Sequence, residues 1–396
     1  MFLKDNVEWL DFLKLRASYG STGNRGVSRY QTLAKLLSTP SYVFGEGGST
    51  TLGQYISTMA NYNLGWETTT GVNVGLDFTV LNSFLSGTIE YYENNTDGII
   101  YNIELPRLTG FGSVATNIGK VHNKGIETTL TARWIRSGNF QWETTVNYAR
   151  NRDKIVSILG PDKNGVEKDF IANGLFIGQP PGVVYNYEII GMWQLEDKKS
   201  GVIPNGFLPG TEKISDLNGD GKYDATNDRK ILGYTAPAYR ISVANRLNYK
   251  NLGLYVMVNS IQGGKNYYMG DDSPYSSGAW SLEEQLKYSN VPKGAWDYWM
   301  PENPNARYRR LDAPSALNPR LYSQRNFIRL QDVSLSYAFD KQLSSKLHLD
   351  GLSVFATGKN LVTITKWRGW DPETGQGFAP SIPFMREYSF GVNIEL

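Results

Sequence analysis

Apolar and polar residues alternate along many stretches of this chain, and residues 72–80 show the pattern most clearly. Every second residue there is apolar, at Val72, Val74, Leu76, Phe78 and Val80. The residues between them are Asn73, Gly75, Asp77 and Thr79. Because successive side chains of a β-strand point to opposite faces, this segment predicts a strand with one apolar face and one polar face.

The same period recurs often enough to predict ten strands. They span residues 12–20, 69–81, 84–94, 121–136, 139–151, 236–249, 252–261, 325–339, 350–360 and 386–396. The connections near 82–83, 137–138 and 250–251 are short, and that at 340–349 is of medium length. Those over 21–68, 94–120, 152–235, 262–324 and 361–385 are long. Since short and long connections alternate, all short turns must lie at one end of the strands.

The predicted fold class is therefore all-β: an antiparallel transmembrane outer-membrane β-barrel with short periplasmic turns and long extracellular loops. A large soluble β-sandwich also alternates and is the alternative. Long strands favour the barrel, and so do aromatic residues near the strand ends, where a barrel carries interfacial girdles. These aromatic residues are Trp66, Trp134, Trp142, Tyr148, Tyr249 and Tyr388.

Composition narrows the function classes. The net charge of +2 over 396 residues gives no support to a nucleic-acid partner. The absence of Cys excludes disulfides and thiol chemistry. His122 and His348 are the only histidines and lie at opposite strand ends, so a hydrolase site built around histidine is hard to assemble. Residues 1–5 do not resemble a signal peptide, and because a barrel must be exported we expect the chain to be part of a longer gene product.

Five stretches, in order along nearly the whole chain, carry a family resemblance. Residues 63–69 read NLGWETT, 118–127 read IGKVHNKGIE, 178–182 read GQPPG, 327–337 read FIRLQDVSLSY and 357–361 read TGKNL. Together they resemble the SusC/RagA-type TonB-dependent (TonB-linked) outer-membrane transporters. The resemblance implies that residues 1–396 are the C-terminal part of a 22-stranded receptor barrel, with the plug domain, the TonB-contacting segment and the signal peptide absent from this chain.

The resemblance also implies a function, a location and partners. The expected function is nutrient uptake in the cell outer membrane, energised by the TonB complex through the missing N-terminal regions. The expected cargo is an oligosaccharide or a peptide, delivered under a SusD-like lipoprotein lid, and the barrel contacts outer-membrane lipid. No enzymatic activity is expected. A self-contained binding or adhesin barrel without active transport is the alternative, because ten strands alone can close a small barrel.

One loop has the spacing of a calcium site. Residues 216–224 place oxygen ligands at the positions of an EF-hand-type loop, with Gly221 at the sharp turn. The candidate ligands are Asp216, Asn218, Asp220, the carbonyl of Lys222, Asp224 and Asp228. Asp228 lies one place beyond the usual last ligand, which is Asn227 here. A structural calcium ion is the predicted cofactor; the alternative is an ion-free turn capped by its own side chains.

Two further groups are candidates for contacts. Aromatic residues of the long loop 262–324 are expected to touch substrate or partner, or else to pack the loop internally. They are Tyr267, Tyr268, Tyr275, Trp280, Trp296 and Trp299. Charged residues on the polar strand faces are expected to tune a channel or to pair with one another. They are Asp77, Glu90, Glu127, Arg133, Glu143, Arg246 and Asp332.

Overall fold

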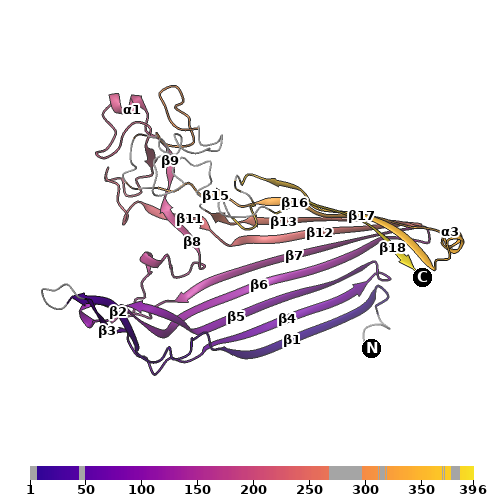
Figure 1. The fold of residues 1–396 in the computed structure, drawn as a ribbon, viewed down its shortest axis with the longest axis horizontal. Coiled ribbons are helices and arrows are strands. Elements are labelled where there is room, and N and C mark those ends of the chain that lie inside the picture. Colours follow the sequence, from indigo (N-terminus) through magenta and orange to yellow (C-terminus); the bar gives the residue numbers. More distant parts are fainter. Residues whose placement is uncertain are drawn as a thin grey trace.

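The computed structural model describes residues 7–43, 50–266, 297–310, 312, 317, 319–367, 369, 371–375 and 384–396. Ten strands form one antiparallel sheet in chain order (Figure 1). The strands are β1 (Leu10–Asn24), β4 (Glu67–Val80), β5 (Leu85–Glu104), β6 (Ser113–Ser137), β7 (Phe140–Ser157), β12 (Pro237–Tyr249), β13 (Leu252–Gly263), β16 (Phe327–Ala338), β17 (Gly351–Thr365) and β18 (Glu387–Glu395). All ten predicted strands are confirmed, as is the all-β class.

Several strands are longer than the alternation predicted. β5 has 20 residues and β6 has 25. Their pairing continues past Gly98, where the register shifts and the backbone enters the left-handed region with a φ of 69°. β7 likewise runs to Ser157, six residues past its predicted end at 151. Strands of about ten residues span a bilayer, so these three strands extend well beyond it at the long-loop end.

The sheet is open. β1 and β18 form its two edges, and they do not pair with each other in the part of the chain that the structure describes. Figure 1 shows β1 beginning and β18 ending at the same end of the sheet. That is the end of the short turns, where α3 (Lys341–Lys346) also lies. Ten antiparallel strands thus place both ends of the sheet's chain path at the short-turn end, and a closed ten-stranded barrel is not what the structure shows.

The apolar face of the sheet is uncovered. Leu13, Val74, Ile126 and Leu335 all remain exposed on it. In a β-sandwich such side chains pack against a second sheet about 10 Å away, but no second sheet of comparable size occurs among the described residues. An exposed apolar face with a polar opposite face fits a wall that contacts lipid.

No helix in the described segments is long and apolar enough to cross a membrane.

The short turns are built from left-handed backbone. Leu81, Asn82 and Ser83 have φ values of 58°, 54° and 58° in the turn between β4 and β5. Non-glycine residues adopt this conformation at a cost, so neighbouring contacts must hold it. The Asp11 carboxylate accepts from the Ser83 amide at 2.6 Å, and Arg136 donates to the carbonyls of Asn82 and Ser83. This turn is therefore fixed by side chains from β1 and β6.

The long connections contain most of the fully buried apolar side chains. We call residues 158–235 together with 297–310 the loop unit. It holds β8 (Val183–Tyr187) paired with β11 (Arg229–Tyr234), β9 (Ile189–Met192) paired with β10 (Glu212–Ile214), and α1 (Leu195–Lys199). Its buried apolar residues are Ile158, Phe176, Val184, Tyr187, Trp193, Ile214, Trp299, Ala306 and Tyr308. Figure 1 shows α1 and β9 standing off the long-loop end of the sheet, so this connection is a folded unit and not an extended loop.

The remaining connections hold short elements. β2 (Lys35–Val43) and β3 (Thr50–Thr58) form a hairpin between β1 and β4. β14 (Lys265–Asn266) pairs with β15 (Ser323–Gln324). Two single-turn 3-10 helices, η1 (Arg107–Thr109) and η2 (Ile171–Asn173), complete the described elements.

Candidate functional site: the polar face and the loop unit

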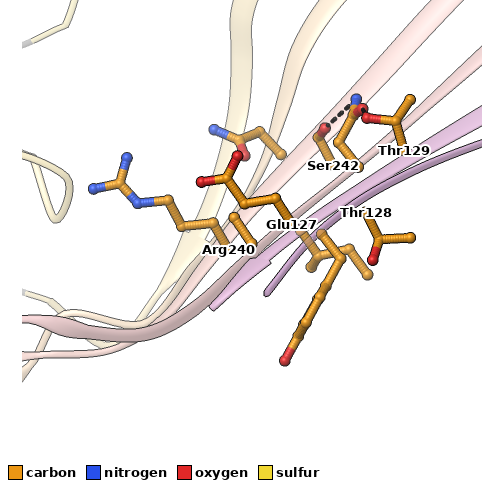
Figure 2. Close-up of a pocket in the computed structure, with 10 residues that line it drawn as sticks. Glu127, Thr128, Thr129, Arg240 and Ser242 are labelled. Carbon is orange, nitrogen blue, oxygen red and sulfur yellow. Dashed lines mark hydrogen bonds between the residues drawn. The ribbon is translucent and has the colours of Figure 1, made fainter. Parts of the chain in front are cut away.

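The polar face of the sheet carries hydroxyl, amide and charged side chains in register. Glu127 of β6 lies opposite Ala149 of β7, which lies opposite Arg240 of β12. Two residues along each strand, on the same face, Thr129 donates to Asn147 at 2.8 Å, and Asn147 donates to Ser242 at 3.2 Å. Figure 2 shows Glu127, Thr129, Arg240 and Ser242 on one side of the strands and Thr128 on the other. These residues line a shallow hollow of about 180 Å³.

An ion-paired cluster crosses β1, β4 and β5 on the same face. Arg16 donates to both oxygens of Asp77, at 2.8 and 3.0 Å, and to Glu90 at 2.6 Å. Thr88 also donates to Asp77, at 3.0 Å. The guanidinium lies over Gly75, where an added Cβ would come within 2.8 Å of Arg16 Nη2. Glycine at this position therefore makes room for the cluster.

The other charged candidates on the polar face differ in whether they have a partner. Arg133 donates to Glu143 at 3.0 Å, so this pair supports the pairing interpretation, as the Arg16 cluster does for Asp77 and Glu90. The guanidinium of Arg246 lies 5.9 Å from the Tyr255 ring. The described residues provide no hydrogen-bond or ion-pair partner for Glu127 or Asp332, which leaves these two carboxylates open to other groups.

An amide cluster on the polar face was not expected from the sequence. Tyr92 donates to Asn151 at 2.9 Å, Asn123 donates to Asn151 at 2.7 Å, and Asn151 donates to Asp153 at 3.1 Å. The Tyr92 ring covers Gly125, where a Cβ would lie within 2.5 Å of the ring. Each of these residues reads as an ordinary strand residue, and only the register of β5, β6 and β7 brings them together. Amides, a phenol and a carboxylate side by side can bind hydroxyl or peptide groups.

A buried arginine fixes the segment after β17, and it too was missed by sequence reasoning. Arg329 of β16 is only 2% exposed. It donates to Asp371, to Glu373 at 2.9 Å and to Thr363 at 3.0 Å. Its guanidinium also lies 4.7 Å from the Phe327 ring centre. These contacts tie residues 371–375 to the polar face of β16 and β17.

Arg325 adds a second tie to the same segment. It donates to the carbonyl of Pro372 at 2.9 Å and to that of Glu373. Burial lowers the pKa of Arg325 below its ordinary value, although the carboxylates of Asp371 and Glu373 oppose this shift. A polar hollow of about 260 Å³ lies beside the cluster, lined by Arg329, Asp371, Thr363 and Arg386 among others.

The loop unit contains the one predicted aromatic contact that the structure describes. Trp299 is 4% exposed, and its indole donates to Gln194 at 3.1 Å. Its ring packs on Gly210, whose φ is 83°. This environment matches the internal-packing alternative, and a contact role for Trp299 stays a prediction. The other five candidates, Tyr267, Tyr268, Tyr275, Trp280 and Trp296, lie outside the described residues.

The Asp-rich loop of the loop unit is closed by its own side chains. Asp216 accepts from the amides of Gly219 at 2.7 Å and Gly221 at 2.9 Å. Asp228 is almost fully buried and accepts from the amides of Leu217 at 3.0 Å and Asp224 at 2.8 Å. Asp228 therefore joins the two ends of the loop through these backbone hydrogen bonds.

The other acidic residues of this loop behave in the same way. Asp220 accepts from the Lys222 amide at 2.8 Å and from the Asn218 side chain at 2.9 Å. The amides of Asn227 and Thr226 hold the pKa of Asp224 below its ordinary value. In the described parts of the chain, no three His, Cys, Asp or Glu residues are grouped as a metal site. Calcium binding stays a prediction here, and these hydrogen bonds are also those of the ion-free turn.

Comparison with known proteins agrees with this geometry. The family described as "TonB dependent receptor-like, beta-barrel" matches residues 6–361. TonB-dependent receptor P3 of Formosa agariphila is 32% identical over 430 residues, which cover 100% of this chain and 40% of that protein. TonB-dependent receptor SusC of Bacteroides thetaiotaomicron is 26% identical over 416 residues, covering 100% of this chain and 38% of SusC.

A solved structure shows the same fold. The RagAB peptide importer in its "open-open" state superposes with a TM-score of 0.78 at 23% identity, covering 99% of this chain and 41% of the matched chain. The chain thus spans about 40% of the length of the relatives that it matches.

Proposed function

Because this chain belongs to the TonB-dependent receptor family of outer-membrane β-barrels, we propose that it forms part of the wall and extracellular surface of a nutrient importer. The observation that carries the proposal is the two-faced sheet of ten consecutive antiparallel strands, apolar and uncovered outside and polar inside. The polar face is then the lumen face, and the loop unit lies on the extracellular side.

The proposed cargo is an oligosaccharide, with a peptide as the alternative. The amide cluster of Tyr92, Asn123, Asn151 and Asp153 supports a polar, hydrogen-bonding cargo, because these groups pair equally well with sugar hydroxyls and with peptide bonds. The matched RagAB structure is described as a peptide importer, which keeps the alternative in place.

The proposed partners are a SusD-like lipoprotein at the extracellular surface and the TonB complex on the periplasmic side. The loop unit supports the first, since it is a folded surface held by its own buried core above the strand ends. TonB would act through parts of the protein outside this chain.

We propose that the titratable groups of the chain take part in transport and not in catalysis. His122 bonds to Glu93 at 2.9 Å on the apolar side of β5 and β6, whereas His348 lies in the short connection after β16 with a φ of 58°. The two histidines are therefore at opposite ends of the sheet. His122 precedes Asn123 in β6, so its side chain lies on the opposite face of the strand from the amide cluster.

Uptake by cells that carry the full-length protein tests the proposal. Asn123→Ala with Asn151→Ala should lower the initial uptake rate of labelled oligosaccharide about 30-fold, since two hydrogen bonds of about 1 kcal/mol each are lost. The control is Thr128→Ala, on the opposite face of β6 (Figure 2). A protonophore should abolish wild-type uptake. Surface binding that persists without any protonophore-sensitive uptake would favour the adhesin alternative.

A further inference from the structure

Four basic side chains lie together on the outer face of the wall. On β7 they are Arg150, Arg152 and Lys154, every second residue, and on β6 the fourth is Lys124, opposite Arg152. We call these four residues the basic ledge. They continue the outer-facing series of Trp142, Val146 and Tyr148 on the same strand, and all four are exposed. The pairing of β6 and β7 is regular from Val121 to Arg133, so the ledge lies on the face turned away from the lumen.

The height of the ledge follows from the strand length. β7 begins at Phe140, next to the short periplasmic turn, and about ten residues of a tilted strand cross the hydrocarbon core. Arg150 is therefore at the extracellular interface, and Arg152 and Lys154 are just above it. Tyr148 is the next outer-facing residue below Arg150 on β7, and its ring centre lies 5.9 Å from that of Tyr239 of β12, as in an interfacial aromatic belt.

The protein compensates little of the charge of the ledge. None of the ion pairs in the described segments includes any of its four residues. The nearest carboxylate in register, Glu93, accepts instead from Tyr91 at 2.8 Å and from His122 at 2.9 Å. Just above, Lys120 pairs with Asp97 at 3.0 Å. Lys124 also interacts electrostatically with the Glu93 carboxylate. Arg150, Arg152 and Lys154 form no ion pair among the described residues, so the ledge is a largely uncompensated group of cations immediately above an apolar band.

We infer that the basic ledge binds the phosphorylated headgroup of a glycolipid in the outer leaflet. The apolar surface below it would contact the acyl chains, and the four cations stand where the headgroup phosphates of such a lipid would lie. Arginine pairs bidentately with phosphate oxygens, and each cation near an anionic surface contributes about a fivefold gain in affinity. A soluble acidic partner would gain nothing from the apolar band, and this continuity favours a lipid.

Lipid retention by the full-length protein in detergent tests the inference. The probe is lipid A with two phosphates, compared with the same lipid after enzymatic removal of both phosphates, and bound lipid is measured by native mass spectrometry. Arg150→Gln, Arg152→Gln and Lys154→Gln together should weaken binding of the phosphorylated lipid on the order of 100-fold. The matched control removes three exposed cations from the loop unit, with Lys163→Gln, Lys198→Gln and Lys199→Gln, and should bind as the wild type does.

Three results would overturn the inference. The first is equal retention by the wild type and the ledge variant, and the second is wild-type binding that does not depend on the phosphates. The third is a ledge variant that changes only its oligomeric state on gel filtration while it keeps the lipid, which would make the ledge a contact between barrels. Heat-modifiable migration of each variant verifies folding. Oligosaccharide uptake should not change, so failure here leaves the proposed transport function untouched.

Discussion

Removal of the Arg329 guanidinium should release the segment that follows β17. In the Arg329→Met variant, Asp371 is left 5% exposed without its cation, and Glu373 loses its partner. Removing one member of a buried ion pair costs about 3–5 kcal/mol. Because the contacts join only residues 371–375 to the strands, most of this cost should appear as local opening and little as unfolding of the barrel.

A Glu-specific protease measures this opening directly, since Glu373 lies in the released segment. When opening is fast relative to cleavage, the cleavage rate follows the population of the open form. A loss of about 3 kcal/mol then corresponds to cleavage about 100-fold faster at Glu373 in the full-length protein. The double variant Arg329→Met with Asp371→Leu should recover most of the protection, because no buried charge is left unpaired.

The matched control is Arg133→Met. Its partner is Glu143, at 3.0 Å, but the Arg133 side chain is 44% exposed. Half-exposed pairs contribute about 0–1 kcal/mol, so this variant should leave the cleavage rate at Glu373 unchanged. Equal rates for Arg329→Met and Arg133→Met would refute the reasoning, and so would a double variant as labile as Arg329→Met alone.

Three other predictions follow from the open sheet and the loop unit. The isolated 396-residue chain should aggregate in lipid or detergent, because β1 and β18 leave unpaired edges; a monodisperse, heat-modifiable barrel would contradict this. If calcium binds, Asp220→Ala with Asp224→Ala should raise protease sensitivity near residue 220 without unfolding the barrel; calorimetry on the full-length protein showing no calcium binding would leave the ion-free turn. Burial would raise the pKa of Glu167, but hydrogen bonds from backbone amides outweigh burial and hold this pKa below its ordinary value. The ionised Glu167 should therefore stabilise the loop unit fully above pH about 4.3 and progressively less below it. Tryptophan fluorescence should show an acid transition of the loop unit that Glu167→Gln weakens.

The strands were predictable because successive side chains alternate between a face that contacts lipid and a face that contacts water. Apolar positions such as Val74 and Leu335 are exposed on one face, and polar positions lie on the other, so a period of two is visible in the sequence alone. The ends of β5, β6 and β7 were less predictable, since beyond the bilayer no face contacts lipid and the strict alternation is lost, as at the adjacent Ile99 and Ile100 of β5. For the same reason the basic ledge was not recognised: Arg152 and Lys154 fall after the predicted strand end at 151.

Among the candidate sites, the sequence predicted only those whose residues lie close together along the chain. The Asp-rich loop is local, and its ring of backbone contacts involves residues close in sequence. The Arg16 cluster joins residues 61 and 74 positions apart, and Arg329 reaches Asp371 across 42 positions. Such pairs depend on strand register, which a single sequence does not specify. The core of the loop unit escaped notice because β8 and β11 pair across a long insertion.

The central claim is that this chain is a wall of an outer-membrane barrel with its short turns in the periplasm, and cysteine labelling tests it most directly. The chain has no Cys, so a single cysteine can be placed at Lys250 in a short turn or at Asn205 in the loop unit of the full-length protein. On intact cells, a membrane-impermeant maleimide should label position 205 and should reach position 250 only after the outer membrane is permeabilised. Labelling of position 250 on intact cells would contradict the account, because all short turns share one side of the membrane.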